Sequence, residues 1–198
     1  MAYQILLHPA EAEIEIKKSR FIAHALPISS REHALNSLQQ LKTRYADARH
    51  HCWAYLLGDP TGSASAAMDD DGEPSGTAGR PILGVLQDRQ VGDTLIVVVR
   101  YFGGIKLGAG GLTRAYRQAA AAVLKTANLL VHQPQVHLRL RFDFAQETSA
   151  RRWVQQHQGQ WITWEYVNEG IEATLQLPQH AAADLKRWAA RHAIHIVD

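Results

Sequence analysis

The sequence predicts an α+β protein with two domains, and three observations carry this prediction. Segments with strand-like alternation and segments with apolar residues at helical spacing follow one another along the chain. A length of 198 residues allows one large domain or two small ones. The pattern changes at a linker-like segment around Pro134, which predicts a first domain over residues 1–132 and a second over residues 133–198.

The first domain begins with a predicted hairpin and helix. Residues 12–16 and 21–26 alternate as strands around Lys17 and Lys18. Ser29 and Glu32 have the spacing of a capping box, which predicts a helix start at this point. The apolar residues that then repeat at helical spacing are Leu35, Leu38, Leu41 and Tyr45.

Glycine-rich segments alternate with strands in the rest of this domain. Residues 51–57 are predicted as a strand, and residues 58–81 as a long loop of the kind that is usually functional or disordered. Residues 94–102, rich in Val and Ile, predict a fully buried strand. A glycine-rich turn over residues 103–111 then leads into an alanine-rich helix that ends near Asn128.

The second domain is predicted as ferredoxin-like. Its segments follow the order strand, helix, strand, strand, helix, strand that defines this unit. The expected ranges are 136–144, 148–157, 161–166, 171–177, 180–192 and 193–197.

Composition and cysteine content exclude several classes of protein. Hydrophobic residues make up 46% and charged residues 20%, which is typical of a folded globular chain and not of a disordered one. A single cysteine, Cys52, excludes an intramolecular disulfide and indicates a reducing compartment. No apolar run approaches the roughly 20 residues that span a bilayer, and no secretory signal is present. We therefore expect a soluble cytoplasmic protein with no membrane partner, while its oligomeric state is left open.

Charge is distributed unevenly along the chain. The 49 residues between Asp93 and Asp143 contain no carboxylate, and an acidic stretch over residues 69–73 precedes them. Such asymmetry bears on partners and not on the fold. The basic residues of the carboxylate-free segment are Arg100, Lys106, Arg114, Arg117, Lys125, Arg139 and Arg141.

The glycine-rich turn between the buried strand and the helix suits a phosphate. A helix N-terminus offers free N–H groups and a partial positive charge, and glycine lets the backbone approach an anion closely. The known phosphate loops do not match, because Ala109 and Gly110 stand where a Walker A loop needs Lys and Ser or Thr, and Thr113 replaces a glycine of the dinucleotide fingerprint. A tight packing corner remains the alternative interpretation.

The helix after this turn has one apolar and one basic face. At about 100° per residue, Arg114, Arg117 and Lys125 lie within roughly 80° of one another. The opposite face carries Leu112, Tyr116, Ala119 and Val123. The basic face is either an ordinary solvated face or a contact for a polyanion, and the lack of any carboxylate on this helix favours the polyanion.

Three further clusters have a structural and a functional interpretation. The acidic residues 69–73 could hold a divalent cation, but they fail the EF-hand spacing, which favours a turn or an internal partner for the basic loop. His50 and His51 point to opposite faces of a strand and no second cysteine is available, so we expect no metal site and a buried structural Cys52. The aromatic residues Trp161, Trp164 and Tyr166 are either a base-stacking platform or, as we favour, core.

Four blocks of the first domain resemble the signature of the IMPACT family and its bacterial YigZ-type members. The blocks are Lys17-Lys18-Ser19-Arg20-Phe21, residues 47–52, residues 70–79 and residues 100–112, in the family's order and spacing. The resemblance is strong over residues 11 to about 130. Beyond that, only length and pattern are similar to the family's small C-terminal domain.

The resemblance implies a first domain like domain 2 of ribosomal protein S5 and domain IV of elongation factor G, and a second domain like domain V of that factor. Eukaryotic members regulate translation initiation through a stress-kinase activator with the help of an extra N-terminal domain, for which this chain leaves no room, so we do not expect that role. What the resemblance implies here is binding of nucleic acid or the ribosome.

Our leading hypothesis is a non-enzymatic, translation-associated protein whose partner is RNA or the ribosome and whose ligand is a phosphate-type anion, with no cofactor and no metal. The alternative is a small-molecule phosphate- or nucleotide-binding enzyme that uses the 103–111 loop, with Asp70, Asp71 and Glu73 holding a metal. We predict no catalytic residues. The expected nucleic-acid or anion contacts are Arg80, Arg100, Gly103, Gly104, Lys106, Gly108, Gly110, Gly111, Arg114 and Arg117, and the family-motif residues without an assigned role are His50, His51, Asp70, Asp71 and Glu73.

Overall fold

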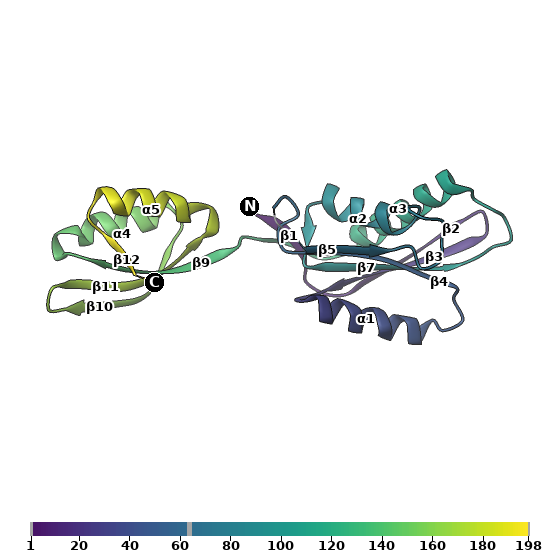
Figure 1. Ribbon diagram of the computed structural model, residues 1–198, viewed down its shortest axis with the longest axis horizontal. Helices are drawn as coiled ribbons and strands as arrows, with labels where there is room; N and C mark the ends of the chain where they lie inside the picture. The colour runs from purple at the N-terminus through teal and green to yellow at the C-terminus, as the bar shows by residue number, and fades with distance from the viewer. Residues whose placement is uncertain (1, 63–64, 198) are drawn as a thin grey trace. The chain divides into compact units, whose positions relative to one another are not determined.

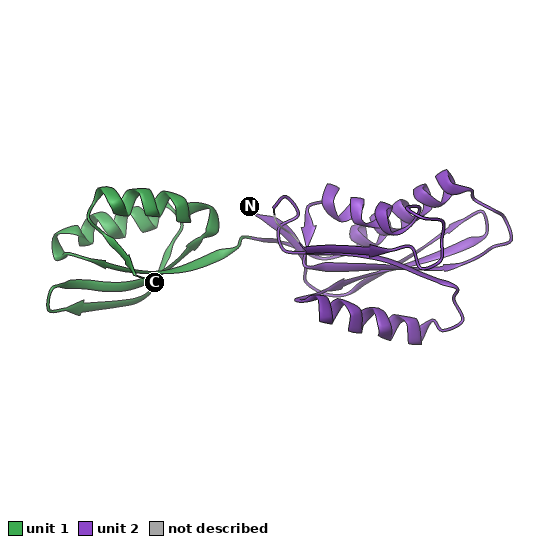
Figure 2. Ribbon diagram, viewed as in Figure 1, with its two compact units in different colours: residues 1, 133–198 green, residues 2–132 purple. Residues whose placement is uncertain are grey.

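The computed structural model describes residues 2–62 and 65–197 of the chain. The chain divides into two compact units, of which the first covers Ala2–His132 and the second covers the residues from Gln133 onward (Figure 2). Both units mix helices with strands, so the predicted α+β class is confirmed. No helix in the described ranges is long and apolar enough to cross a membrane.

A five-stranded antiparallel sheet forms the centre of the first unit. Its strand order is β2-β3-β7-β4-β5. The predicted hairpin is confirmed as β2 and β3, which join through Lys17 and Lys18, both at positive φ. The strands are β2 (Ala10–Ile16), β3 (Ser19–Pro27), β4 (His50–Leu57), β5 (Ser65–Asp69) and β7 (Thr94–Tyr101).

Helices cover both faces of this sheet. Helix α1 (Arg31–Arg44) lies on one face, and α2 (Gly79–Asp88) and α3 (Ala109–Thr126) lie on the other (Figure 1). The central strand β7 is buried on both faces, as its run of Val and Ile predicted. Alternate residues of β7 enter two separate cores, with Ile96 and Val98 against α2 and α3 and Leu95, Val97 and Val99 against α1. The predicted core face of α3 is also confirmed: Leu112, Tyr116, Ala119 and Val123 are all buried.

A second, smaller sheet ties the start of the first unit to its end. Strand β1 (Tyr3–Leu6) pairs in parallel with β6 (Val91–Gly92) and antiparallel with β8 (Leu129–His132). These strands have two to four residues each. Segments this short carry too little periodicity to be recognised in a sequence.

Two local predictions in this unit were wrong. The helix cap of α1 is Ser30 and not Ser29, because the Ser30 side chain accepts the His33 N–H at 3.0 Å. The predicted loop 58–81 contains the strand β5, which pairs with β4 at the edge of the sheet, and the first three residues of α2. Residues 63–64 of that loop lie outside the described residues.

The second unit has the predicted element order, with short 3₁₀ turns before each helix. Its antiparallel sheet has the order β10-β11-β9-β12, and α4 and α5 cover one face (Figure 1). The elements are β9 (Gln135–Phe142), α4 (Glu147–Gln156), β10 (Gln160–Val167), β11 (Gly170–Pro178), α5 (Ala182–Arg191) and β12 (His195–Val197). Trp161 and Trp164 pack against the core as expected, whereas Tyr166 is 63% exposed and is not a core residue.

Candidate functional site

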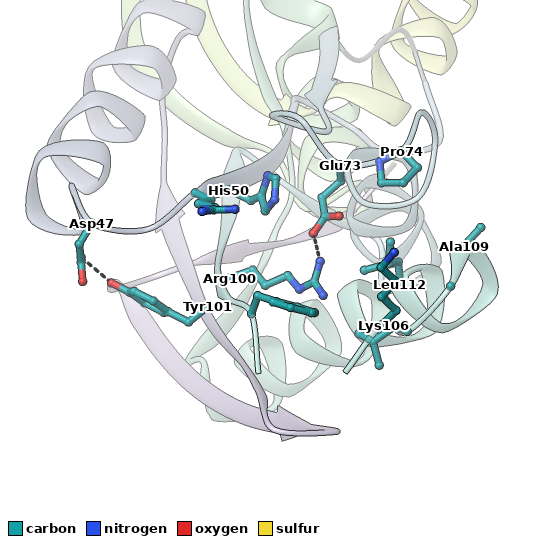
Figure 3. Close-up of a pocket in the computed structure, with 13 residues that line it drawn as sticks. Asp47, His50, Glu73, Pro74, Arg100, Tyr101, Lys106, Ala109 and Leu112 are labelled. Atoms are coloured by element: carbon teal, nitrogen blue, oxygen red, sulfur yellow. Dashed lines mark hydrogen bonds and ion pairs between the residues drawn. The ribbon is translucent and has the colours of Figure 1, made fainter. Parts of the chain in front are cut away.

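A pocket of about 630 Å³ lies in the first unit where β7 turns toward α3 (Figure 3). This volume falls within the usual range of small-ligand sites, about 300–1,000 Å³. The lining mixes cationic side chains with apolar ones. The lining residues are Asp47, Arg49, His50, Glu73, Pro74, Arg100, Tyr101, Phe102, Lys106, Leu107, Gly108, Ala109 and Leu112.

Sheet register places Arg100 at the base of this pocket. Arg100 is paired with Phe21 of β3 on one side and with His50 of β4 on the other. Directly paired residues of neighbouring strands share a face of the sheet. Phe21 belongs to the core under α2 and α3, so Arg100 points toward that face near the end of the strand.

The Arg100 guanidinium is buried in an ion pair. Its Nη1 donates to Glu73 Oε1 at 2.5 Å, and the two side chains are only 7% and 4% exposed (Figure 3). The guanidinium carbon lies 5.5 Å from the ring centre of Phe21 and 5.6 Å from that of Phe102. The Nε donor of Arg100 is buried and has no acceptor among the described residues. Arg100 therefore faces the interior of the pocket and is not a solvated surface cation.

Tyr116 and Cys52 support Glu73 from beneath. The Tyr116 hydroxyl donates to Glu73 Oε1 at 2.7 Å. The Cys52 thiol lies 3.2 Å from that hydroxyl and 3.0 Å from the carbonyl oxygen of Asp70, within reach to donate to either. Burial raises the pKa of both the Cys52 thiol and the Tyr116 hydroxyl, so both groups stay protonated. The expected buried structural Cys52 is confirmed.

The glycines of the 103–111 turn serve different purposes. A Cβ on Gly103 would stand 2.0 Å from the carbonyl of Lys18, so this glycine allows close packing against the β2–β3 turn. Gly104 and Gly108 adopt φ values of +86° and +71°, where side chains are disfavoured. A Cβ on Gly111 would lie 3.1 Å from the Leu107 Cβ, but one on Gly110 would meet nothing closer than Arg114 Nη1 at 3.7 Å. Gly110 lies inside the helix, and packing does not require a glycine at this position.

The N-terminus of α3 opens onto the pocket. Gly108 is the cap residue and supplies no side-chain acceptor. The first helical N–H with a backbone acceptor is that of Leu112, which donates to the Gly108 carbonyl at 2.9 Å. Among the described residues, no acceptor engages the N–H groups of Ala109, Gly110 and Gly111, which can therefore meet a ligand, with the exposed Lys106 beside them.

The acidic residues 70 and 71 are used inside the fold. Asp70 accepts the N–H groups of Gly76, Ala78 and Gly79 and so caps the start of α2. Burial alone would raise the pKa of Asp70, but these three donors outweigh it and the pKa lies below its usual value. Asp71 accepts from Lys42 Nζ at 2.8 Å and from the His51 N–H at 2.7 Å. In the described part of the chain, no group of three or more His, Cys, Asp and Glu side chains could hold a metal ion.

His50 and His51 point to opposite faces of the sheet, as strand geometry predicted. The His50 Nδ1 lies 2.8 Å from the carbonyl oxygen of Asp71 and His50 lines the pocket. His51 is 5% exposed on the α1 side, and burial lowers its pKa. Only His50 is placed to meet a ligand.

The remaining predicted contacts lie on the outer surface of α2 and α3. Arg80 and Arg114 are exposed, and no ion pair engages either of them within the described ranges. Arg117 is also exposed but pairs with Asp88 at 2.5 Å. The structure thus separates the predicted set into pocket residues and residues of an outer helix surface.

Sequence reasoning missed part of the pocket lining. Arg49 is exposed on the approach to β4, and Phe102 is 57% exposed at the end of β7. Arg49 lies in one of the four blocks of resemblance, and Phe102 directly precedes the glycine turn. Nothing in the local pattern indicated that both would face the same pocket, because this depends on strand register.

Comparisons with known proteins agree on one family. A family model described as the Impact N-terminal domain matches residues 17–124. A Haemophilus influenzae protein named IMPACT family member is 39% identical over 83% of this chain and 78% of its own length. The Escherichia coli protein named IMPACT family member YigZ is 37% identical over 80% of this chain and 78% of its own length. A solved structure titled as a hypothetical protein superposes with a TM-score of 0.67 at 32% identity, covering 99% of this chain and 96% of that one.

Proposed function

Because this chain belongs to the IMPACT family, we propose that it is a non-enzymatic protein of translation that binds RNA or the ribosome. The contact surface in this proposal is the outer face of α2 and α3 together with the start of α3. We also propose that the first unit has the fold of domain 2 of ribosomal protein S5 and domain IV of elongation factor G. For the second unit we propose a ferredoxin-like fold.

The charge of the α2–α3 layer is the observation that carries this proposal. The two helices contain four basic side chains and a single acidic one, Asp88. A solvated helix surface ordinarily mixes both signs, whereas a surface that meets phosphates gains affinity from each unpaired cation. The four basic residues are Arg80, Arg114, Arg117 and Lys125.

The alternative of a metal-assisted enzyme is less well supported. It requires Asp70, Asp71 and Glu73 to hold a metal near a transferred phosphate. The Asp70 oxygens accept three backbone N–H groups, Asp71 binds Lys42, and Glu73 pairs with Arg100. These contacts account for the acidic residues as parts of the fold.

Ribosome co-sedimentation and RNA titrations at several salt concentrations test the proposal. Arg114→Ala should weaken binding to RNA of any sequence and lower the salt slope by about 0.7–0.9, the change for one lost phosphate contact. The matched control is Arg152→Ala, which removes an exposed helical arginine from the second unit.

Asp88→Asn tests the same helix surface with the opposite expected change in RNA affinity. Because Asp88 competes with phosphate for Arg117, its neutralisation should tighten RNA binding. An unchanged affinity and salt slope in both Arg114→Ala and Asp88→Asn would overturn the proposal.

A further inference from the structure

We propose that the pocket at the start of α3 holds one nucleotide unit, with its phosphate at the helix N-terminus and its base against Phe102. The inference rests on the proposed function in that both use the start of α3. It goes further by naming a ligand with a defined size and two chemical ends. The nucleotide is either free or an unpaired residue of an RNA strand.

The phosphate end of the site is built from backbone and cationic groups. At the positive end of the α3 dipole, the N–H groups of Ala109, Gly110 and Gly111 find no acceptor in the part of the chain that the structure describes. Lys106 and Arg49 line the same pocket, are exposed, and take part in no ion pair within residues 2–62 and 65–197. A phosphate bound here would have a hydrogen-bond cradle and the neighbouring Lys106 as a counter-charge, with Arg49 in the lining of the same pocket.

Buried Arg100 provides a second and independent indication of a ligand. Its side chain is more than nine-tenths buried and points toward Glu73 at the base of the pocket (Figure 3). Glu73 engages Nη1, while Nε finds no acceptor in the described part of the chain. A buried donor without a partner is unfavourable, and such groups in native proteins commonly meet a water or a ligand oxygen.

The pocket also offers apolar surface that suits a flat, weakly polar group. Phe102 is 57% exposed, and Leu107 and Leu112 add two apolar side chains to the same lining. Exposed aromatic rings are the usual stacking partners of unpaired bases, since each base presents a π-face. Inorganic phosphate would make no contact with the apolar lining residues. An apolar ligand would make no favourable contact with the cationic ones.

The two carboxylates of the lining do not oppose an anion at the helix end. Glu73 is neutralised by Arg100 and accepts from Tyr116. Asp47 accepts from the Tyr101 hydroxyl at 2.8 Å, away from Lys106 in Figure 3. Positive charge therefore predominates on the side where α3 begins.

Calorimetric titration of the full chain with adenosine 5′-monophosphate, inorganic phosphate and adenosine tests this inference. The monophosphate should bind more tightly than either of its parts. Lys106→Gln should weaken the binding of both the monophosphate and inorganic phosphate. The matched control is Lys186→Gln, which replaces an exposed lysine of the second unit.

Phe102→Ala should lower the affinity for the monophosphate and for adenosine at least fivefold, as expected for the loss of base stacking. The affinity for inorganic phosphate should stay unchanged. Phe102→Trp should retain affinity. Phe144→Ala, which removes a 49% exposed phenylalanine from the second unit, is the matched control. A monophosphate that binds no more tightly than inorganic phosphate, or an unaltered affinity in Phe102→Ala, would overturn the inference.

Competition with a single-stranded RNA oligonucleotide separates the two sources of the nucleotide. Displacement of RNA by the monophosphate supports both the pocket site and the RNA-binding proposal. Monophosphate binding without displacement supports a free nucleotide as the ligand, and the salt-dependence experiment with Arg114→Ala then decides the RNA proposal separately. Absence of monophosphate binding refutes the pocket site while leaving the outer helix surface to be judged by its own variants.

Discussion

Replacement of Gly110 by alanine separates the structural purpose of the glycine turn from its functional one. Gly110 is the second residue of α3 and does not have a positive φ. The added Cβ would meet only the Arg114 Nη1 at 3.7 Å, which is an ordinary contact. Alanine is favoured over glycine in a helix by about 0.5–1 kcal/mol, so stability should rise by up to this amount. For a chain of this size, the melting temperature should rise by about 1–4 °C.

Ligand binding should change in the opposite direction. Side chains on a helix lean toward its N-terminus, so the new methyl group would project toward the approaching anion. If one charge-assisted hydrogen bond of roughly 1.5 kcal/mol is lost, affinity for RNA should fall about tenfold. The variant would then be more stable and bind less well, a combination that a purely structural glycine does not produce.

Thermal unfolding and RNA titration on the same preparation measure both effects. Gly103→Ala is the control for the packing role, because its Cβ would overlap the Lys18 carbonyl and should destabilise the fold. A loss of stability in Gly110→Ala would refute the conformational argument. Unchanged affinity in the stable variant would refute Gly110 as an anion contact.

Three further predictions follow from the network around Arg100 and the cap of α2. Cys52 should resist thiol reagents in the native state and react once urea unfolds the chain, whereas rapid native labelling would contradict its burial. Glu73→Gln leaves the Arg100 charge buried without a counter-charge and should lower the free energy of unfolding by about 3–5 kcal/mol, measured by urea titration. Because the folded pKa of Asp70 is lowered, its contribution to stability is present above the unfolded value of about 3.9 and is lost as pH falls through the folded pKa. Asp70→Asn should therefore be less stable than the parent at pH 7, and the difference should narrow in urea titrations below about pH 4.

The larger elements could be predicted because their signals are local. The Val- and Ile-rich β7, the hairpin of β2 and β3 and the two faces of α3 each follow from periodicity within one segment. Strand β5 and the small sheet of β1, β6 and β8 carry no such signal, because edge pairing supplies the stability that their own residues do not. The α1 cap is Ser30 and not the predicted Ser29, because a helix boundary can shift by one residue without changing the apolar pattern that predicts the helix.

Only the part of the candidate site that is contiguous in sequence could be predicted. The glycine turn and the basic face of α3 could be identified because strand, turn and helix are contiguous in sequence. The pairing of Glu73 with Arg100 and the exposure of Phe102 depend on how β4, β7 and the 70–79 loop meet in space. The sequence accordingly predicted Arg100 only as an anion contact, and its burial against Glu73 became apparent from the structure.

The four blocks that carry the family resemblance form one local structure around Arg100. Gly103 packs against the β2–β3 turn, Arg49 precedes β4 and His50 begins it, and the 70–79 loop contributes Glu73 and the cap of α2. Most of these residues have a clear part in holding the fold together. Arg49, Lys106 and Gly110 do not, since they are exposed and no packing within the described residues requires them, and Phe102 contributes only its contact with the Arg100 guanidinium. Arg49, Lys106 and Phe102 line the pocket, and Gly110 lies in the first turn of α3 beside it. Their chemistry is available to a ligand, so we expect substitutions of these four residues to weaken binding first.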